Sequence, residues 1–369
     1  MTAAPADVLP VCRHRRPLVR SQRALAAGRL AVGFLGGSIT APKTGTRWPE
    51  AWIDALGQRH PQVRPVVENA ALGATGSDLA VFRAEEEIIV RGCDLVFVEY
   101  SVNDYDQPAV RRGRTREGLV RQLLAAGIDV VLVHTFRAEM LSDLEAGRDP
   151  ASVADFERLA DHYGVGSVQA GLHAWRQVRE GRMTPDEWLP DGLHPERLGS
   201  GLYAEAVHAF CAASWDLAAT RASAPATPLP APLDPGCWER VALLPLEQVA
   251  CSGPWTLRRW FHCAGMVRAL HTTAARAGLR CAFDGRGLVL GFDFGRDSGE
   301  VRYRVDGGDW VSTQRDRPPW CEARGWFRPT VVADDLSAGP HAFELETLPG
   351  RTDGVETTET TIGLVGAIR

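Results

Sequence analysis

Short apolar runs alternate with amphipathic segments over the first 220 residues of the chain. Five short runs rich in valine and other apolar residues are typical of buried strands. They cover residues 30–35, 63–68, 94–100, 128–133 and 165–169. Segments with helical spacing of their apolar positions cover residues 48–59, 77–91, 115–126, 151–163 and 198–217. Strands that alternate with helices predict an α/β domain whose mostly parallel sheet is covered on both faces.

The pattern changes after Thr220. Residues 220–236 contain five prolines among alanine, serine and threonine, which predicts an extended linker. Beyond the linker, apolar residues alternate with a period of two, and strands are expected at 288–294, 301–305, 341–347 and 361–368. Two adjacent glycines after residue 306 permit the tight turn of a hairpin. We therefore expect an N-terminal arm (1–29), an α/β domain (30–219), the linker (220–236) and an all-β sandwich or jelly roll (237–369).

Composition and charge make several classes of protein poor candidates. No stretch approaches the ~18 uninterrupted apolar residues of a membrane-spanning helix. The 41 basic and 46 acidic residues give a net charge of −5, so neither nucleic acid nor an anionic membrane is an expected partner. The pair Arg15-Arg16 is not followed by the apolar segment of a signal peptide, and we expect a cytoplasmic protein.

The eight cysteines include no C-x-x-C pair. We expect mostly buried, reduced thiols, although a disulfide among the five C-terminal cysteines remains open. The cysteines and histidines between residues 251 and 271 match no common zinc site. We therefore expect neither a metal nor a cofactor.

The first candidate for chemistry is the turn Gly36-Gly37-Ser38, at the carboxyl end of the first expected strand. Ligands bind at that edge of open α/β sheets. Two glycines permit a sharp turn that leaves the serine hydroxyl exposed. No lysine stands at the spacing of a phosphate-binding loop, and no G-x-S-x-G motif is present. Such a turn alone is more often structural than catalytic.

The second candidate is Asp191-Gly192-Leu193-His194, directly before the last expected helix of the α/β domain. A serine nucleophile needs a base, and the base needs a group that orients it. An aspartate three residues before a histidine can turn its carboxylate back to the imidazole Nδ1. The Nε2 atom of His194 is then free to face a hydroxyl.

Two further residues are candidates for an oxyanion hole. Asn103 follows the strand expected at 94–100, and its side-chain amide is a neutral donor suited to an oxyanion. Gly73 follows the strand expected at 63–68, and a glycine lets a substrate approach its backbone N–H. Trp48, after the serine turn, is a candidate to line the acyl or alcohol pocket, with helix packing as the alternative.

Ser38, Gly73, Asn103 and His194 occur in this order, each at the same expected edge of one sheet. The sequence over residues 30–217 resembles the SGNH (GDSL-type) hydrolase superfamily, which is named for its Ser, Gly, Asn and His blocks. The first block reads Gly-Gly-Ser-Ile-Thr rather than the commoner Gly-Asp-Ser. The third reads Ser-Val-Asn-Asp, and the last is the family's Asp-x-x-His.

The resemblance implies a flavodoxin-like, three-layer fold and metal-free acyl chemistry. By that resemblance Ser38 is the nucleophile, His194 the base and Asp191 the residue that orients it. The backbone N–H groups of Ser38 and Gly73 and the side chain of Asn103 would form the oxyanion hole. The β module, through residues 294–299 and 303–308, is similar to the C-terminal accessory domain of two-domain SGNH carbohydrate esterases.

We therefore expect a serine esterase that hydrolyses small acyl esters, above all acetyl esters, on a carbohydrate. An O-acyltransferase would use the same residues and replace water with a sugar hydroxyl. A third alternative is a carbohydrate-binding protein whose hydrolase fold is inactive, against which the four intact blocks argue. The expected partner is a small-molecule or carbohydrate ester, and the sequence does not indicate an oligomeric state.

Overall fold

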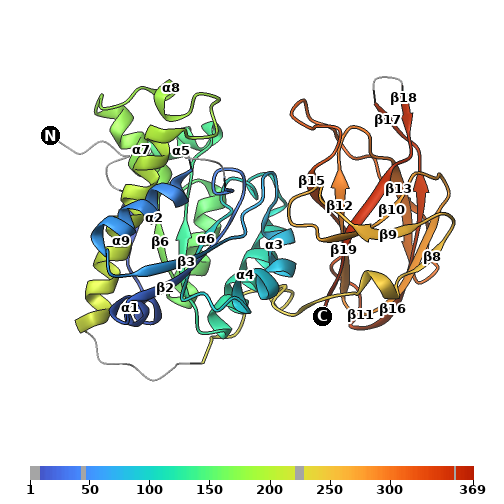
Figure 1. Cartoon of the computed structure of the whole chain (residues 1–369), viewed down its shortest axis with the longest axis horizontal. Coiled ribbons are helices and arrows are strands. Elements are labelled where there is room, and N and C mark those ends of the chain that lie inside the picture. The colour runs from blue at the N-terminus through green and yellow to red at the C-terminus, as the bar shows by residue number, and fades with distance from the viewer. Residues whose placement is uncertain (1–8, 43–46, 221–227, 353–354) are drawn as a thin grey trace. The chain divides into compact units, whose positions relative to one another are not determined.

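The structure of the chain is a computed structural model that describes residues 9–42, 47–220, 228–352 and 355–369 (Figure 1). The chain divides into two compact units, Met1–Glu239 and Arg240–Arg369. The expected arm over 1–29 and linker over 220–236 lie partly outside the described residues. Of the helices that are described, none is long and apolar enough to cross a membrane.

The first unit is built on one sheet with the strand order β1-β6-β5-β4-β2-β3. The strands are β1 (Cys12–Arg13), β2 (Arg29–Gly36), β3 (Arg64–Asn69), β4 (Leu95–Glu99), β5 (Asp129–Val133) and β6 (Gly166–Val168). All neighbours pair in parallel except β1, which is antiparallel to β6. Without β1, this is the flavodoxin-like order, in which ligands bind at the carboxyl ends of the strands.

Helices cover both faces of this sheet, as the alternation predicted. One face carries α1 (Val19–Ala26), α2 (Trp48–Arg59), α7 (Ala170–Arg179) and α9 (Arg197–Thr220). The other carries α3 (Ser77–Ala84), its π-helical continuation η2 (Glu85–Ile89), α4 (Ala109–Ala125) and α6 (Ala151–Tyr163). Short segments complete the unit: η3 (Ala138–Met140), α5 (Leu141–Glu145) and α8 (Pro185–Trp188). Along β4, Phe97 belongs to the first core and Val96 and Val98 belong to the second.

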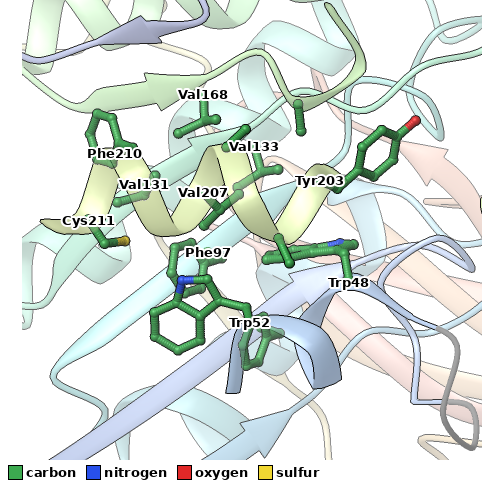
Figure 2. Close-up of a cluster of buried hydrophobic side chains, with 14 of the residues drawn as sticks. Trp48, Trp52, Phe97, Val131, Val133, Val168, Tyr203, Val207, Phe210 and Cys211 are labelled. Carbon is green, nitrogen blue, oxygen red and sulfur yellow. The ribbon is translucent and has the colours of Figure 1, made fainter. Parts of the chain in front are cut away.

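Aromatic side chains dominate the core between α2, α9 and the sheet (Figure 2). The rings of Trp48 and Trp52 pack edge-on against Phe97, with centroids 5.6 and 5.0 Å away. Tyr203 and Val207 of α9 belong to the same buried cluster. This packing holds α2 and α9 firmly against the sheet.

The N-terminal region contains more regular structure than the expected aperiodic arm. It supplies β1 at one edge of the sheet and α1, in which Ser21, Ala24 and Leu25 are buried. Arg13 and Arg15 both form ion pairs with Glu157 of α6. The frequent arginines of this region interrupt its apolar pattern, which is why the pattern did not indicate a helix.

The segment that leads out of the first unit packs on α4. The N–H of Trp238 donates to the carbonyl of Arg114 over 3.0 Å, and the Trp238 side chain is fully buried. A β-carbon at Gly118 would overlap the Trp238 backbone, so this close approach requires a glycine. The first unit therefore extends to Glu239, three residues beyond the end of the expected linker.

The second unit is a β-sandwich of antiparallel strands. One sheet has the order β15-β12-β19-β10-β9 with β7 on β19, and the other has the order β14-β13-β16-β11-β8. The strands are β7 (Val241–Leu243), β8 (Ala250–Ser252), β9 (Thr256–Arg259), β10 (Arg268–Thr272), β11 (Gly278–Gly285), β12 (Gly287–Phe294), β13 (Glu300–Val305), β14 (Val311–Ser312), β15 (Trp326–Ala333), β16 (Gly339–Leu348) and β19 (Thr360–Ile368). A short 3₁₀ turn, η4 (Leu246–Gln248), and the ribbon β17 (Gly350–Thr352) with β18 (Val355–Thr357) complete it.

Apolar side chains from both sheets fill the sandwich. Leu279 and Phe343 come from one sheet and Leu290 and Ile362 from the other, and all four belong to one buried cluster. The hairpin expected after residue 301 is confirmed by the pairing of β13 with β14. Its turn has positive φ at positions 306 and 307. All eight cysteines are described, and no disulfide joins any two of them.

Candidate active site

The residues expected to carry chemistry meet at the carboxyl ends of β2, β3 and β4. Ser38 follows β2, and a β-carbon at Gly73 would lie 3.7 Å from the Ser38 β-carbon. Asn103 follows β4, and a β-carbon at Gly37 would overlap its carboxamide. The Ser38 side chain is partly exposed and Gly73 is exposed, so a ligand can reach both. Three segments that are distant in sequence thus converge on one point.

Both glycines before Ser38 are required by close packing. Gly37 has no room for a side chain beside Asn103, and a β-carbon at Gly36 would lie 2.8 Å from the Thr40 β-carbon. The N–H groups of Thr40 and Ala41 donate to the Gly37 carbonyl over 3.0 and 2.8 Å. The turn therefore brings the serine to the sheet edge directly against the oxyanion candidates.

The imidazole of His194 lies between Ser38 and Asp191. The Ser38 Oγ is 2.7 Å from His194 Nε2, and His194 Nδ1 is 2.7 Å from Asp191 Oδ2. The other oxygen of Asp191 accepts the N–H groups of Leu193 and His194 over 2.9 and 2.6 Å. Because a carboxylate can only accept, Nδ1 carries the proton and Nε2 accepts from the Ser38 hydroxyl.

The charge of Asp191 is strongly favoured in this geometry. Partial burial alone would raise the pKa of Asp191, but the N–H of His194, the imidazole and the N–H of Leu193 hold it at about 2. A carboxylate at this position can orient the imidazole and stabilise an imidazolium.

The loop that carries Asp191 and His194 is partly exposed and is tied to the rest of the unit through Arg47. Gly192 has a φ of 77°, a left-handed conformation that suits glycine. The buried Arg47 donates to the carbonyl of Pro195 over 3.0 Å and is attracted electrostatically by Asp191. The side chain of Asp191 nevertheless remains 58% exposed and that of His194 29% exposed.

The Asn103 loop, in contrast, is held by a buried ion pair that sequence reasoning missed. The carboxylate of Asp104 is 2.8 Å from Arg116 Nε, and the two side chains are 0% and 1% exposed. Asp104 also accepts from the N–H and hydroxyl of Ser77, over 3.0 and 2.7 Å. Arg116 donates to the carbonyl of Tyr100 over 3.0 Å. Residues on both sides of Asn103 are therefore fixed by the same guanidinium.

A second serine–histidine–carboxylate set lies behind this loop. His134 is 2.7 Å from Ser101 Oγ through Nδ1 and 3.0 Å from Glu157 through Nε2. All three side chains are buried, and Glu157 is also paired with two arginines. Because no substrate reaches a buried hydroxyl, this set holds the start of the Asn103 loop in place and has no direct part in chemistry.

Of the two alternatives for Trp48, its burial favours helix packing over the lining of a substrate pocket. Its side chain is completely buried in the core between α2 and the sheet (Figure 2). The indole N–H donates to Thr40 Oγ1 over 2.9 Å, which accounts for its only polar atom. Within the described ranges, no group of three or more His, Cys, Asp or Glu side chains could hold a metal ion.

Comparison with known proteins shows what the chain resembles in sequence family and in fold. Residues 34–202 match the GDSL-like lipase/acylhydrolase family, and this range includes Ser38, Gly73, Asn103, Asp191 and His194. The chain is similar in structure to a two-domain esterase (CEX) active on acetylated mannans, with a TM-score of 0.80 and 23% identity over 96% of each chain. The crystal structure of a two-domain esterase (CEX) active on acetylated mannans, co-crystallised with mannopentaose, is similar to the chain with a TM-score of 0.79. The identity is 22% over 96% of this chain and 95% of that chain. No curated protein matches the chain.

The family match and the two-domain likeness agree with the fold described above. They cover the α/β unit with its serine turn at the strand ends and the β-sandwich that follows it. Residues 34–202 of the first unit are therefore similar to the GDSL-like lipase/acylhydrolase family, and the chain as a whole shares the fold of a two-domain esterase.

Proposed function

We propose that this chain is a serine esterase that removes small acyl groups, above all acetyl, from a carbohydrate. The observation that carries the proposal is the continuous chain of hydrogen bonds from Ser38 Oγ through His194 to Asp191, with both distances at 2.7 Å. The Gly73 backbone and the Asn103 carboxamide lie beside the serine turn. A hydroxyl, a base, an oriented carboxylate and neutral donors are the groups that acyl transfer requires.

In the proposed mechanism, the Ser38 Oγ attacks the ester carbonyl and its proton moves to His194 Nε2. The carbonyl oxygen becomes an oxyanion, which accepts hydrogen bonds from the N–H groups of Ser38 and Gly73 and from the Asn103 side chain. The bond to the alcohol then breaks, and the alcohol leaves with the proton of His194. Water repeats the sequence on the acyl-Ser38 and releases the carboxylic acid, while Asp191 stabilises the imidazolium in both steps.

The acetyl and carbohydrate parts of the proposal have separate support. The structure that is similar over both units is an esterase active on acetylated mannans. The family match supports ester hydrolysis without naming an alcohol. A carbohydrate acetyl ester is the substrate class that agrees with both findings.

The test is hydrolysis of p-nitrophenyl esters of increasing acyl length, together with acetate release from acetylated mannan, by the wild type and by Ser38→Ala. We expect activity that falls as the acyl chain lengthens and a Ser38→Ala variant that folds normally but is inactive. Ser252→Ala, which removes an exposed serine of the second unit, is the matched control and should behave as the wild type. Turnover of Ser38→Ala at the wild-type rate would refute the mechanism. Recovery of the acetyl group on an added sugar instead of as acetate would identify an acyltransferase.

A further inference from the structure

A buried carboxylate lies directly behind the serine turn. Glu99 is the last residue of β4, and its side chain is 0% exposed. Its Oε2 accepts from the Thr40 hydroxyl over 3.0 Å, and its Oε1 accepts from the Thr135 hydroxyl over 2.7 Å. The backbone of Gly37 also hydrogen-bonds to this carboxylate. Glu99 therefore connects the serine turn to the end of the neighbouring strand β5.

The direction of the Thr40 hydrogen bond is fixed by Trp48. The indole N–H of Trp48 can only donate, and it lies 2.9 Å from Thr40 Oγ1. The Thr40 hydroxyl thus accepts from Trp48, and its single proton is available to Glu99. The arrangement presents donors to both oxygens of Glu99, and these hydrogen bonds favour its ionised form against the burial that opposes it.

The groups that Glu99 holds lie on both sides of Ser38. Gly37 precedes the serine, and Thr40 ends the turn that follows it. The Asn69 side chain adds a further bond to the Thr40 carbonyl, over 3.0 Å. The direction in which the Ser38 N–H and hydroxyl point is set by this short stretch of backbone, so a change at Glu99 is transmitted to the reacting group.

The position of Glu99 is costly for a residue with only a structural role. No ion pair to Glu99 is found in the described part of the chain, so hydrogen bonds alone compensate its burial. Burial raises the pKa of Glu99 to about 7, although the bonds from Thr135, Thr40 and Gly37 oppose that rise. A leucine here would extend the apolar core without this cost.

We propose that Glu99 is a positioning residue for the nucleophile: its carboxylate holds Gly37 and Thr40 so that Ser38 faces both His194 and the oxyanion hole. The inference rests on the proposed function, because it takes Ser38 as the nucleophile. Glu99 itself takes no proton from the substrate. Its effect is on the rate of acyl transfer and not on substrate affinity.

Asp129 provides a matched control on the same pair of strands. It begins β5 and pairs with Leu95, so it lies at the end of the sheet opposite to Glu99. Its carboxylate is partly buried and has no ion pair among the described residues, and it accepts the N–H and hydroxyl of Ser21, both over 2.8 Å. Burial raises the pKa of Asp129 as it does that of Glu99. Asp129→Asn thus repeats the chemical change of Glu99→Gln away from the site.

The experiment compares Glu99→Gln with Asp129→Asn in the full chain, using kcat and KM on a short-chain ester and the rate at which a fluorophosphonate labels Ser38. We expect Glu99→Gln to lower kcat and the labelling rate together, by on the order of 10–100-fold, with KM changed by less than about threefold. Asp129→Asn should keep kcat within about twofold of the wild type, whatever its melting temperature.

Thr135 gives a second, smaller perturbation if Glu99→Gln folds poorly. Thr135→Val removes one donor to Glu99, whereas Thr135→Ser keeps the hydroxyl. We expect the valine variant to lose kcat and the serine variant to recover most of it. Equal kcat in Glu99→Gln and the wild type, or an equal loss in Asp129→Asn, would overturn the inference. A wild type that neither hydrolyses esters nor reacts with the fluorophosphonate would instead refute the proposed function.

Discussion

The two sides of the candidate site are built in different ways. The side with Ser38 and Asn103 stands on strand ends and is held by buried charged groups, namely Glu99 and the pair Asp104–Arg116. The side with Asp191 and His194 is a partly exposed loop, and the hydrogen bonds by which Asp191 orients His194 join residues within three positions of each other. The first side depends on long-range packing, and the second on local chain geometry.

Because of this difference, substitutions on the two sides should affect the stability of the fold and the rate of hydrolysis to different extents. A buried, hydrogen-bonded charge cannot be removed without leaving its partner unsatisfied, so changes on the nucleophile side affect the fold as well as the rate. An exposed carboxylate can be replaced while the fold remains, so changes in the base loop should affect the rate alone. Each prediction below changes one side and measures the rate of hydrolysis, the stability of the fold, or both.

The largest expected effect is on the base side. Asp191→Asn keeps the shape of the side chain but can no longer fix the imidazole tautomer, and we expect kcat to fall by about 10⁴-fold. The melting temperature should change by less than about 2 °C, because Asp191 is mostly exposed. Asp186→Asn, an exposed aspartate in α8 of the same region, is the control and should leave both quantities unchanged. If kcat decreased by less than tenfold, Asp191 would not be the residue that orients His194.

Arg116→Met should have the opposite signature. It leaves the buried Asp104 without its cation, and we expect the free energy of unfolding of the first unit to fall by about 3–5 kcal/mol. Denaturant unfolding followed by tryptophan fluorescence measures this, because several tryptophans are buried in that unit. Arg148→Met, which removes a largely exposed ion pair with Asp143, is the control and should cost less than about 1 kcal/mol. Equal effects of the two variants would contradict the account of the Asn103 loop.

Asn103→Ala should mainly affect the transition state. The loss of one oxyanion donor is expected to lower kcat by about 10²–10³-fold with little change in KM. Steady-state kinetics on a p-nitrophenyl ester measures both constants. A variant that raised KM at an unchanged kcat would place Asn103 in substrate binding and outside the oxyanion hole.

The smallest expected effect is a pH dependence of stability that Glu99 causes. Burial raises the pKa of Glu99 to about 7 in the folded chain, against ~4.3 in an unfolded one. Between these values the folded state binds more protons, so the contribution of Glu99 is fully present below ~4.3 and is lost as the pH rises through about 7. Glu99→Gln cannot titrate, so its melting temperature relative to the wild type should rise steadily from pH 4.5 to pH 8.

The comparison with Glu99→Gln isolates this one group. Asp104, Tyr100 and Tyr203 interact electrostatically with Glu99, and they are present in both proteins. Burial raises the pKa values of both tyrosines far above neutral pH, so they stay uncharged throughout. A difference in melting temperature that does not change with pH would contradict the assignment.

The contrast between the two sides also explains what the sequence could reveal. Asp191 and His194 stand three residues apart, so their contact is visible as a local pattern. Ser38, Gly73 and Asn103 each follow an expected strand, and the parallel sheet brings strand ends together. The fold class and the place of the site could therefore be predicted from periodicity and from short motifs.

The supporting network could not be predicted in that way. Glu99 lies within an apolar run and contacts residues 59 and 36 positions away. Arg116 reads as an ordinary helical residue, yet it is among the largest fully buried side chains. Trp48 follows the serine turn in sequence but belongs to the core. Such roles depend on tertiary packing, which a single sequence does not display.

The role of Ser38 as the nucleophile is tested most directly by identifying the residue that carries the acyl group during turnover. The protein is quenched with acid while it hydrolyses a p-nitrophenyl ester, and its peptides are analysed by mass spectrometry. We expect an acyl group on the peptide that contains Ser38 in the wild type and in Ser252→Ala, and no acyl group on that peptide in Ser38→Ala. Ester hydrolysis with the acyl group on another residue, or undiminished hydrolysis by Ser38→Ala, would contradict this role of Ser38.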